Sequence, residues 1–159
     1  MVLPGVNQND VTIPDSVEVS PTGDFGVRVK ASVANWATAG RVFVSKRAGA
    51  GTEAYQFDTA LGNSIQLAWW DSGGTLKAAS VAKPAGISNY QTVWLRADLD
   101  VDNGAGIYQV SFYWATDAAT PNWTLISVVD GAATTSVRDT NAVVRFGTGV
   151  SGNVTGDVS

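Results

Sequence analysis

The sequence of 159 residues contains no cysteine and no histidine. Without cysteine the chain forms neither disulfides nor thiolate metal sites, so it gives no indication of a redox compartment. Without histidine it lacks the side chain that most transition-metal sites and every histidine-based nucleophilic triad require. These two absences exclude several large classes of enzyme.

Charge is also scarce, because charged residues make up 15% of the chain and the formal net charge is −4. An average soluble domain contains about 25% charged residues. No basic cluster occurs, so the chain lacks the attraction to phosphate that holds proteins on nucleic acid or anionic lipid. We therefore expect neither a nucleic-acid partner nor a membrane partner.

Long apolar runs are missing as well. No window approaches the roughly 18 apolar residues needed to span a bilayer, and the segment Met1 to Gly5 has no basic stretch followed by an apolar one. The chain thus has the pattern of a soluble protein without a signal peptide. Its length suits one domain of ordinary size, so residues 1–159 are expected to form a single domain.

The apolar residues follow a period of two, and no segment keeps helical spacing over three turns. Between Phe25 and Val33 every odd position is apolar, whereas Arg28, Lys30 and Ser32 occupy even positions. Such alternation is typical of antiparallel strands with one solvated face. Strands of this kind are predicted at 65–70, 93–101 and 107–116, and further strands near 11–13, 41–46, 54–59, 76–80, 125–130 and 142–148.

Turn residues separate the predicted strands, and 17 glycines contribute to these turns. Asn103-Gly104 follows the strand 93–101 and tolerates the positive φ of a tight hairpin, so this strand should pair with 107–116. Short strands at regular intervals indicate a sandwich or a barrel. The predicted fold class is all-β, with two antiparallel sheets in a jelly-roll sandwich.

Several segments, in this order, carry a family resemblance that extends over nearly the whole chain. They are Leu3 to Val6, Thr12 to Ser16, Thr22 to Phe25, Trp94 to Ala105, Phe112 to Asp117 and Trp123 to Leu125. Through them the chain resembles the concanavalin A-like (laminin G-like) jelly-roll domains of the lectin/glucanase type, as found in minor tail proteins of phages that infect actinobacteria. The resemblance implies a location on the tail or capsid surface of a virion and other virion proteins as partners.

The C-terminal end departs from that family. Such domains close with one more apolar strand after a glycine-rich turn, whereas this sequence ends at Ser159. Either the last strand is missing or it comes from elsewhere. A missing strand would leave a sheet edge with unpaired N–H and C=O groups, which favours pairing with another chain. We therefore expect an oligomer or a larger assembly.

Five residues that alternate along one strand form the most informative cluster, and they are Trp94, Arg96, Asp98, Asp100 and Asp102. Alternation places them together on the polar face. An aromatic ring stacks on a sugar ring while arginine and carboxylate groups bond its hydroxyls, so the cluster predicts a carbohydrate site. The side chains expected to join it from neighbouring strands are Gln109, Ser111, Tyr113 and Trp70.

A structural alternative accounts for the same residues. Trp94 would pack under a loop, and Arg96 with Arg28 would neutralise Asp98 and Asp100 across strands, each pair contributing about 0.2–1 kcal/mol. Both interpretations place the strand in the same phase. They differ in whether the ring of Trp94 is open to solvent.

The run Asp98, Asp100 and Asp102 before a glycine-containing turn also raises the possibility of calcium. The spacing departs from the EF-hand pattern, because the loop glycine falls one place late and the twelfth position is Gln109 rather than Glu. A calcium site of another type and an ordinary hairpin both remain open. No other cofactor is expected.

Retaining glycosidases require two carboxyl groups about 5–5.5 Å apart. Asp98 and Asp100 are near enough in sequence. Jelly-roll hydrolases present Glu-x-Asp-x-x-Glu on a central strand, however, and the only two glutamates here, Glu18 and Glu53, belong to no such motif. We therefore expect no enzymatic activity.

The remaining tryptophans and one charged pair have simpler interpretations. Trp69 and Trp114 are in phase with apolar neighbours and should lie in the core. Trp36 and Trp123 fall near predicted turns, where each serves as a loop plug or as an exposed lectin-like finger. Lys46 and Arg47 end a predicted strand and should be solvated.

The sequence thus favours a virion component that binds a host-surface carbohydrate without catalysing a reaction. The affinity of each site would be weak, and many copies on one particle would raise the overall affinity. A purely structural decoration or assembly domain is the alternative, and a glycan hydrolase is a third hypothesis.

Overall fold

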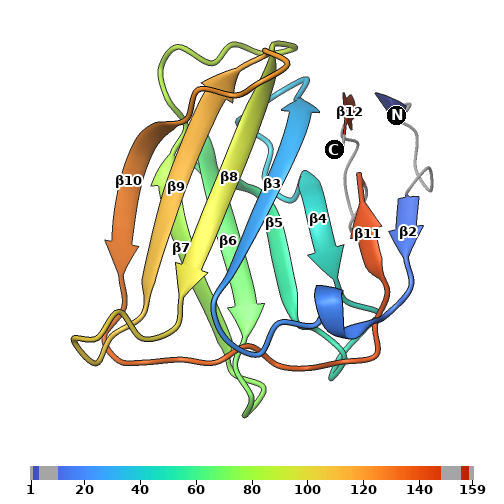
Figure 1. The fold of residues 1–159 in the computed structure, drawn as a ribbon. Helices are drawn as coiled ribbons and strands as arrows, with labels where there is room; N and C mark the ends of the chain where they lie inside the picture. The colour runs from blue at the N-terminus through green and yellow to red at the C-terminus, as the bar shows by residue number, and fades with distance from the viewer. Residues whose placement is uncertain (1, 4–10, 148–154, 158–159) are drawn as a thin grey trace.

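The fold is a sandwich of two antiparallel sheets, seen in the computed structural model in Figure 1. The structure describes residues 2–3, 11–147 and 155–157. Within these residues the one helical element is a 3-10 turn at Val17–Val19, and no helix is long and apolar enough to cross a membrane. The predicted two-sheet, all-β class is confirmed.

Each sheet contains six strands among the residues that the structure describes. The front sheet of Figure 1 has the order β1 (Val2–Leu3), β12 (Thr155–Asp157), β3 (Phe25–Ser32), β8 (Thr92–Asp100), β9 (Gln109–Thr116) and β10 (Thr124–Asp130). The rear sheet has the order β2 (Val11–Ile13), β11 (Val144–Phe146), β4 (Val42–Lys46), β5 (Tyr55–Ala60), β6 (Ser64–Trp70) and β7 (Leu76–Ala82). The ten strands expected from the sequence are all present, with ends shifted by at most a few residues.

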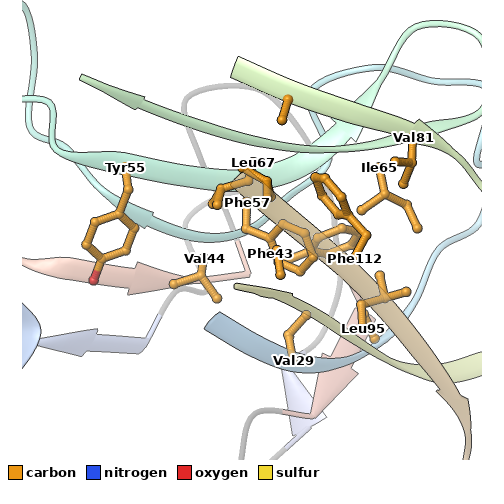
Figure 2. Packing of buried hydrophobic residues seen from close by; sticks show 14 of the residues in the cluster. Val29, Phe43, Val44, Tyr55, Phe57, Ile65, Leu67, Val81, Leu95 and Phe112 are labelled. Atoms are coloured by element: carbon orange, nitrogen blue, oxygen red, sulfur yellow. The ribbon is translucent and has the colours of Figure 1, made fainter. Parts of the chain in front are cut away.

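The core fills the space between the two sheets, where Figure 2 shows side chains from both inner faces in contact. Leu95 and Phe112 reach it from the front sheet, and Phe43, Phe57 and Leu67 from the rear sheet. Phe43 and Phe57 meet edge to face at 5.5 Å. Burying each such side chain contributes about 1.5–3 kcal/mol, so this layer holds the sheets together.

The predicted hairpin of the front sheet is confirmed, since β8 pairs with β9 from Val93 to Asp100. Side chains of its loop stabilise the turn: Asp102 Oδ1 accepts the Gly104 N–H at 3.1 Å, and Asn103 Oδ1 accepts the Ala105 N–H at 3.0 Å. Gly104 has φ +81°, a conformation that costs glycine little. The loop therefore uses the residues that identified it in the sequence, although it is longer than a two-residue turn.

A short strand closes the sheet near the C-terminal end. β12 pairs with β3 on one side and with β1 on the other. Among the described residues β12 covers β3 only at Lys30–Ser32, so the edge that a missing last strand would leave is partly paired, whereas Phe25–Val29 pair with β8 alone. The outermost strands are β1 and β10 in the front sheet and β2 and β7 in the rear sheet.

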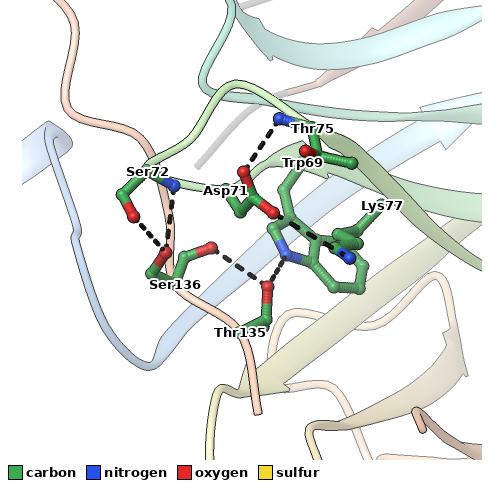
Figure 3. Close-up of polar contacts among 7 residues, drawn as sticks. All are labelled: Trp69, Asp71, Ser72, Thr75, Lys77, Thr135 and Ser136. Atoms are coloured by element: carbon green, nitrogen blue, oxygen red, sulfur yellow. Dashed lines mark hydrogen bonds and ion pairs between the residues drawn. The ribbon is translucent and has the colours of Figure 1, made fainter. Parts of the chain in front are cut away.

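The segment 131–143 crosses below both sheets to reach β11 (Figure 1) and is bonded to the turn after β6. Figure 3 shows Trp69 Nε1 donating to Thr135 Oγ1 at 3.3 Å and the Ser72 N–H donating to Ser136 Oγ at 3.0 Å. Asp71 Oδ1 accepts the Thr75 N–H at 2.8 Å within the same turn. These bonds fix the lower end of the sandwich and leave its two outer faces available.

The expectations for three tryptophans are confirmed. Trp69 is fully buried, and Trp114 packs partly buried against the core. Trp36 is a loop plug, because it is buried and its Nε1 donates to the Ser88 carbonyl at 3.2 Å.

The expectation for Lys46 is wrong. Its side chain has no exposed surface, and its ammonium forms an ion pair with Asp15 and a 2.7 Å bond to Ser20 Oγ. Lys46 points inward at the end of β4, where the segment around the 3-10 turn supplies the polar partners. A buried ammonium is tolerated there because it is paired.

Candidate functional site

The polar face of the front sheet carries most of the residues that the sequence pattern placed together. Arg96 on β8 lies directly between Arg28 on β3 and Tyr113 on β9. In the next row Asp98 lies between Gly26 and Ser111, and beyond it Asp100 lies opposite Gln109. The alternation of β8 is thus confirmed, since Val93, Leu95, Ala97 and Leu99 are all buried in the core.

Arg96 and Asp98 form a bidentate ion pair on this face. Arg96 Nε donates to Asp98 Oδ1 at 2.9 Å, and Nη2 lies 2.7 Å from Oδ2. The hydrogen bond to Asp98 raises the pKa of Arg96, so the guanidinium stays charged. Both side chains keep solvent access, at 40% for Arg96 and 29% for Asp98. The pair presents remaining donors and acceptors in a fixed orientation.

Two aromatic rings hold the guanidinium of Arg96. Its Cζ lies 5.3 Å from the ring centre of Tyr113 and 5.9 Å from that of Trp123. Contacts of a cation with ring faces at such distances contribute about 0.5–1 kcal/mol each at exposed sites. Arg96 is therefore restrained by one carboxylate and two rings.

Gly26 gives Asp98 its position above β3. A Cβ built on Gly26 would lie 2.6 Å from Asp98 Oδ1. The carboxylate therefore rests over the bare Cα, closer to the sheet than any side chain at position 26 would allow. Sequence reasoning missed this role, because a glycine within a strand carries no pattern that points to its neighbour.

Trp94 points outward as predicted, and its ring is packed under a loop, as in the structural alternative, rather than open to solvent as the carbohydrate interpretation requires. Only 7% of the residue is exposed. Its Nε1 donates to the Ala118 carbonyl at 3.1 Å, and Trp123 meets it edge to face at 6.4 Å. Lys30 Nζ lies 5.8 Å from the ring centre. The loop 117–123 thus covers Trp94, and the half-buried Trp123 and Tyr113 are the rings at the surface.

The prediction that Trp70 joins this face is wrong. Trp70 belongs to β6 of the rear sheet and lies beside Leu76 of β7. Its ring is covered on one side by Arg47, whose Cζ lies 5.7 Å from the ring centre. The period of two placed Trp70 on an outer face correctly, but it does not indicate which sheet a strand joins.

The three aspartates proposed for calcium do not converge. Asp98 is bonded to Arg96, Asp100 Oδ1 accepts the Asp102 N–H at 3.0 Å, and Asp102 Oδ1 accepts the Gly104 N–H. No group of three potential ligands arranged for a metal occurs anywhere in the described part of the chain. Gln109, the other residue considered, donates from Nε2 to Asp130 Oδ1 at 2.9 Å. The geometry therefore favours an ordinary hairpin over a cation site.

An apolar rim on β10 borders the polar residues. Leu125 lies opposite Tyr113 and Val128 opposite Ser111, and they are 51% and 41% exposed. A bulge between Leu125 and Ser127 shifts the register, so both point outward despite their odd spacing. A strict period of two could not reveal this rim, because the bulge changes the phase.

The front face is thus a half-exposed surface on rigid strands, with one ion pair, two aromatic rings and an apolar rim. Its chemistry suits noncovalent recognition of a ligand that offers hydroxyl groups and an apolar face. The class of protein is accordingly a two-sheet β-sandwich with a polar, aromatic patch on one sheet.

Comparison with known proteins identifies the fold. The chain matches no protein-family model and no curated protein. It is similar to the crystal structure of the botulinum neurotoxin serotype G binding domain, with a TM-score of 0.61 and 12% identity over 91% of this chain and 34% of that one. A botulinum neurotoxin type G receptor binding domain aligns with a TM-score of 0.44 and 11% identity over 97% of this chain and 37% of that one.

This chain spans about a third of the length of those structures. At such low identity the first likeness shows a shared β-sandwich fold alone. The concanavalin A-like assignment and the phage origin stay predictions.

Proposed function

We propose that the chain is a binding domain without catalytic chemistry, and that the polar face of the front sheet binds carbohydrate. The neurotoxin structure to which it is similar is a binding domain, which supports a recognition role for the sandwich. The ligand would lie over Arg96, Asp98 and Tyr113, with Trp123 at one end.

The observation that carries the proposal is the fixed Arg96–Asp98 pair held between two rings. A sugar offers apolar C–H faces to an aromatic ring and hydroxyls to a guanidinium or a carboxylate. Because the pair is oriented before the ligand arrives, little side-chain freedom is lost on binding. The apolar rim of Leu125 and Val128 extends the contact beyond one ring.

A binding role without catalysis is supported by the neighbours of Asp98. Glycoside hydrolysis needs a second carboxyl group facing the first. The cross-strand neighbours of Asp98 are Gly26 and Ser111, and both of its oxygens face Arg96. Asp98 is therefore suited to accept bonds from a ligand rather than to exchange protons with it.

The biological setting follows from the resemblance to phage tail domains in the segment Trp94 to Ala105. We place the chain on the tail or capsid surface of a virion, bound to a glycan of the host surface and to other virion proteins. Many copies on one particle would multiply a weak affinity. A purely structural decoration role is the second candidate, and it is favoured by the apolar rim on the outermost strand β10, a surface suited to packing on another protein.

The test is binding of the purified chain to immobilised actinobacterial cell-wall polysaccharide and to a glycan array. We expect Arg96→Ala and Tyr113→Ala each to weaken binding at least tenfold. Tyr90→Ala is the matched control, because Tyr90 is 74% exposed in a loop outside the site. If the wild-type chain binds no glycan, or if all four proteins bind equally, the front face is not a carbohydrate site and the structural role is favoured.

A further inference from the structure

The outer face of the rear sheet carries a second set of side chains that the front-face site does not use. We name it the rear face, and its residues are Arg47, Gln56, Asp58, Gln66, Trp70 and Leu76. The strand pairing arranges them in rows, with Trp70 beside Leu76 and Asp58 beside Gln66. The two faces lie on opposite sides of the sandwich.

A chain of contacts runs across the rear face. The guanidinium of Arg47 covers one side of the Trp70 ring, and its Nη1 donates to Gln56 Oε1 at 3.0 Å. Gln56 Nε2 in turn donates to Asp58 Oδ2. Ring, cation, amide and carboxylate thus form one connected group, whereas the connected group of the front face has rings, a cation and a carboxylate.

Short side chains lie between the two rows. Ala68 on β6 pairs with Ala78 on β7, and the next row toward Asp58 contains Gln66 beside Ser80. Leu76, Ala78 and Ser80 are exposed. A ligand lying along β6 and β7 would therefore meet an apolar end at Trp70 and Leu76 and a polar end at Gln66, with little side-chain bulk between them.

Buried polar atoms without partners provide an independent indication of a ligand. Asp58 is 5% exposed, and its Oδ1 makes no hydrogen bond. Ser45 Oγ, directly across from Gln56, is fully buried and also lacks a partner. Folded proteins rarely leave such atoms unpaired unless a water or a ligand completes the network. Gln56 is adjacent to both, since it pairs with Ser45 across the strands and bonds to Asp58.

We infer that the rear face is a second binding surface, for a neutral polyhydroxylated ligand of the sugar class. Over β6 and β7 the accessible groups are the indole of Trp70, the leucine side chain of Leu76, the amide of Gln66 and the hydroxyl of Ser80, which match hydroxyls and C–H groups rather than an ionic ligand. Arg47 is linked through Gln56 to Asp58, whose opposite charge reduces the attraction of this group for an anion. The inference goes beyond the front-face proposal, because binding here needs none of the front-face residues.

Indole NMR signals separate the two faces. The six tryptophans give six Nε1–H signals, assigned with single Trp→Phe variants. Soluble oligosaccharides released from actinobacterial cell-wall polysaccharide serve as the probe. We expect the Trp70 signal to shift saturably, and to shift equally in Arg96→Ala. Gln66→Ala should weaken the Trp70 response at least fivefold and leave the Trp123 response unchanged.

Leu61→Ala is the control, because Leu61 is 80% exposed in the turn between β5 and β6, away from Trp70. An unshifted Trp70 signal overturns the inference, as does a Trp70 shift that disappears in Arg96→Ala. A Trp70 shift without any Trp123 shift would overturn the front-face proposal and support the rear face. Retention of the remaining indole signals shows that each variant is folded.

If both faces bind the polysaccharide, one chain can cross-link two coated particles. A monomeric chain, checked by light scattering, should agglutinate beads coated with the polysaccharide, whereas Trp70→Ala and Arg96→Ala should bind beads at reduced occupancy and fail to agglutinate them. Agglutination by Trp70→Ala at the wild-type level would contradict a binding rear face.

Discussion

The ammonium of Lys46 is buried against the carboxylate of Asp15, and Ser20 Oγ bonds to both. These contacts join the end of β4 to the segment around the 3-10 turn. The hydrogen bond from Lys46 lowers the pKa of Asp15. Since the native state favours the ionised carboxylate, Asp15 contributes stability above its unfolded pKa of about 4, and this is lost as the pH falls through the lowered value.

Asp15→Asn should therefore lower the urea midpoint at pH 7, because it removes the charge that pairs with the buried ammonium. The difference from wild type should shrink below pH 4. Asp139→Asn is the matched control, since Asp139 is exposed in the crossing segment. Equal midpoints for Asp15→Asn and wild type at pH 7 would show that the ion pair does not stabilise the fold.

The stability contributed by Asp58 should depend on pH in the opposite way to that contributed by Asp15. Burial raises its pKa from 3.8 to about 6, despite the opposing bond from Gln56 and the charge of Arg47. A raised pKa means that the native state favours the protonated form. The stabilisation is complete below about pH 4 and is lost as the pH rises to about 6.

Asp58→Asn should consequently be more stable than wild type at pH 7, by about 3 kcal/mol, and nearly equal to it at pH 4. Urea unfolding of both proteins at pH 4, 5, 6 and 7 measures the difference directly. A constant difference across this range would mean that the carboxyl of Asp58 titrates alike in the folded and unfolded chains.

The face of the sheet to which each strand residue points was predictable from the sequence, because it depends on local geometry. Neighbouring side chains on a strand point to opposite faces, so the inward placement of Leu95 required outward placement of Arg96. The hairpin between β8 and β9 was equally local, since Asn103-Gly104 determines where the chain reverses. Both features involve residues that are close in the chain.

The errors concern contacts between distant residues. Nothing near Trp70 shows that β6 joins the rear sheet, and nothing near Trp94 shows that the loop 117–123 covers it. The alternation also fails at the bulge after Leu125, where one extra residue reverses the phase. Burial of Lys46 depends likewise on Asp15, which lies 31 residues away.

Gly26→Ala should disturb the Arg96–Asp98 pair while leaving the fold nearly unchanged. The added methyl would contact Asp98 Oδ1 at 2.6 Å, and a carboxylate end can move away from it. We expect a stability change within about 1 kcal/mol, because alanine suits a strand better than glycine. The exchange of the Arg96 Nε–H with water should accelerate severalfold, since its acceptor is displaced.

Gly23→Ala is the control for this substitution, because a Cβ there meets no atom within 4 Å. In that variant the Arg96 Nε–H should exchange with water at the wild-type rate. If the Arg96 Nε–H also exchanges at the wild-type rate in Gly26→Ala, the position of Asp98 does not depend on the bare Cα of Gly26.

Trp123→Ala should uncover Trp94. The edge-to-face contact at 6.4 Å would be lost, and the bond from Trp94 Nε1 to Ala118 would become open to water. Because Trp123 is half-buried, we expect a loss of about 1–2 kcal/mol rather than the cost of emptying a core site. Hydrogen exchange at Trp94 Nε1 should accelerate at least tenfold. Trp70→Ala, on the other sheet, should leave that rate unchanged, and an unchanged rate in Trp123→Ala would mean that the loop 117–123 covers Trp94 without help from Trp123.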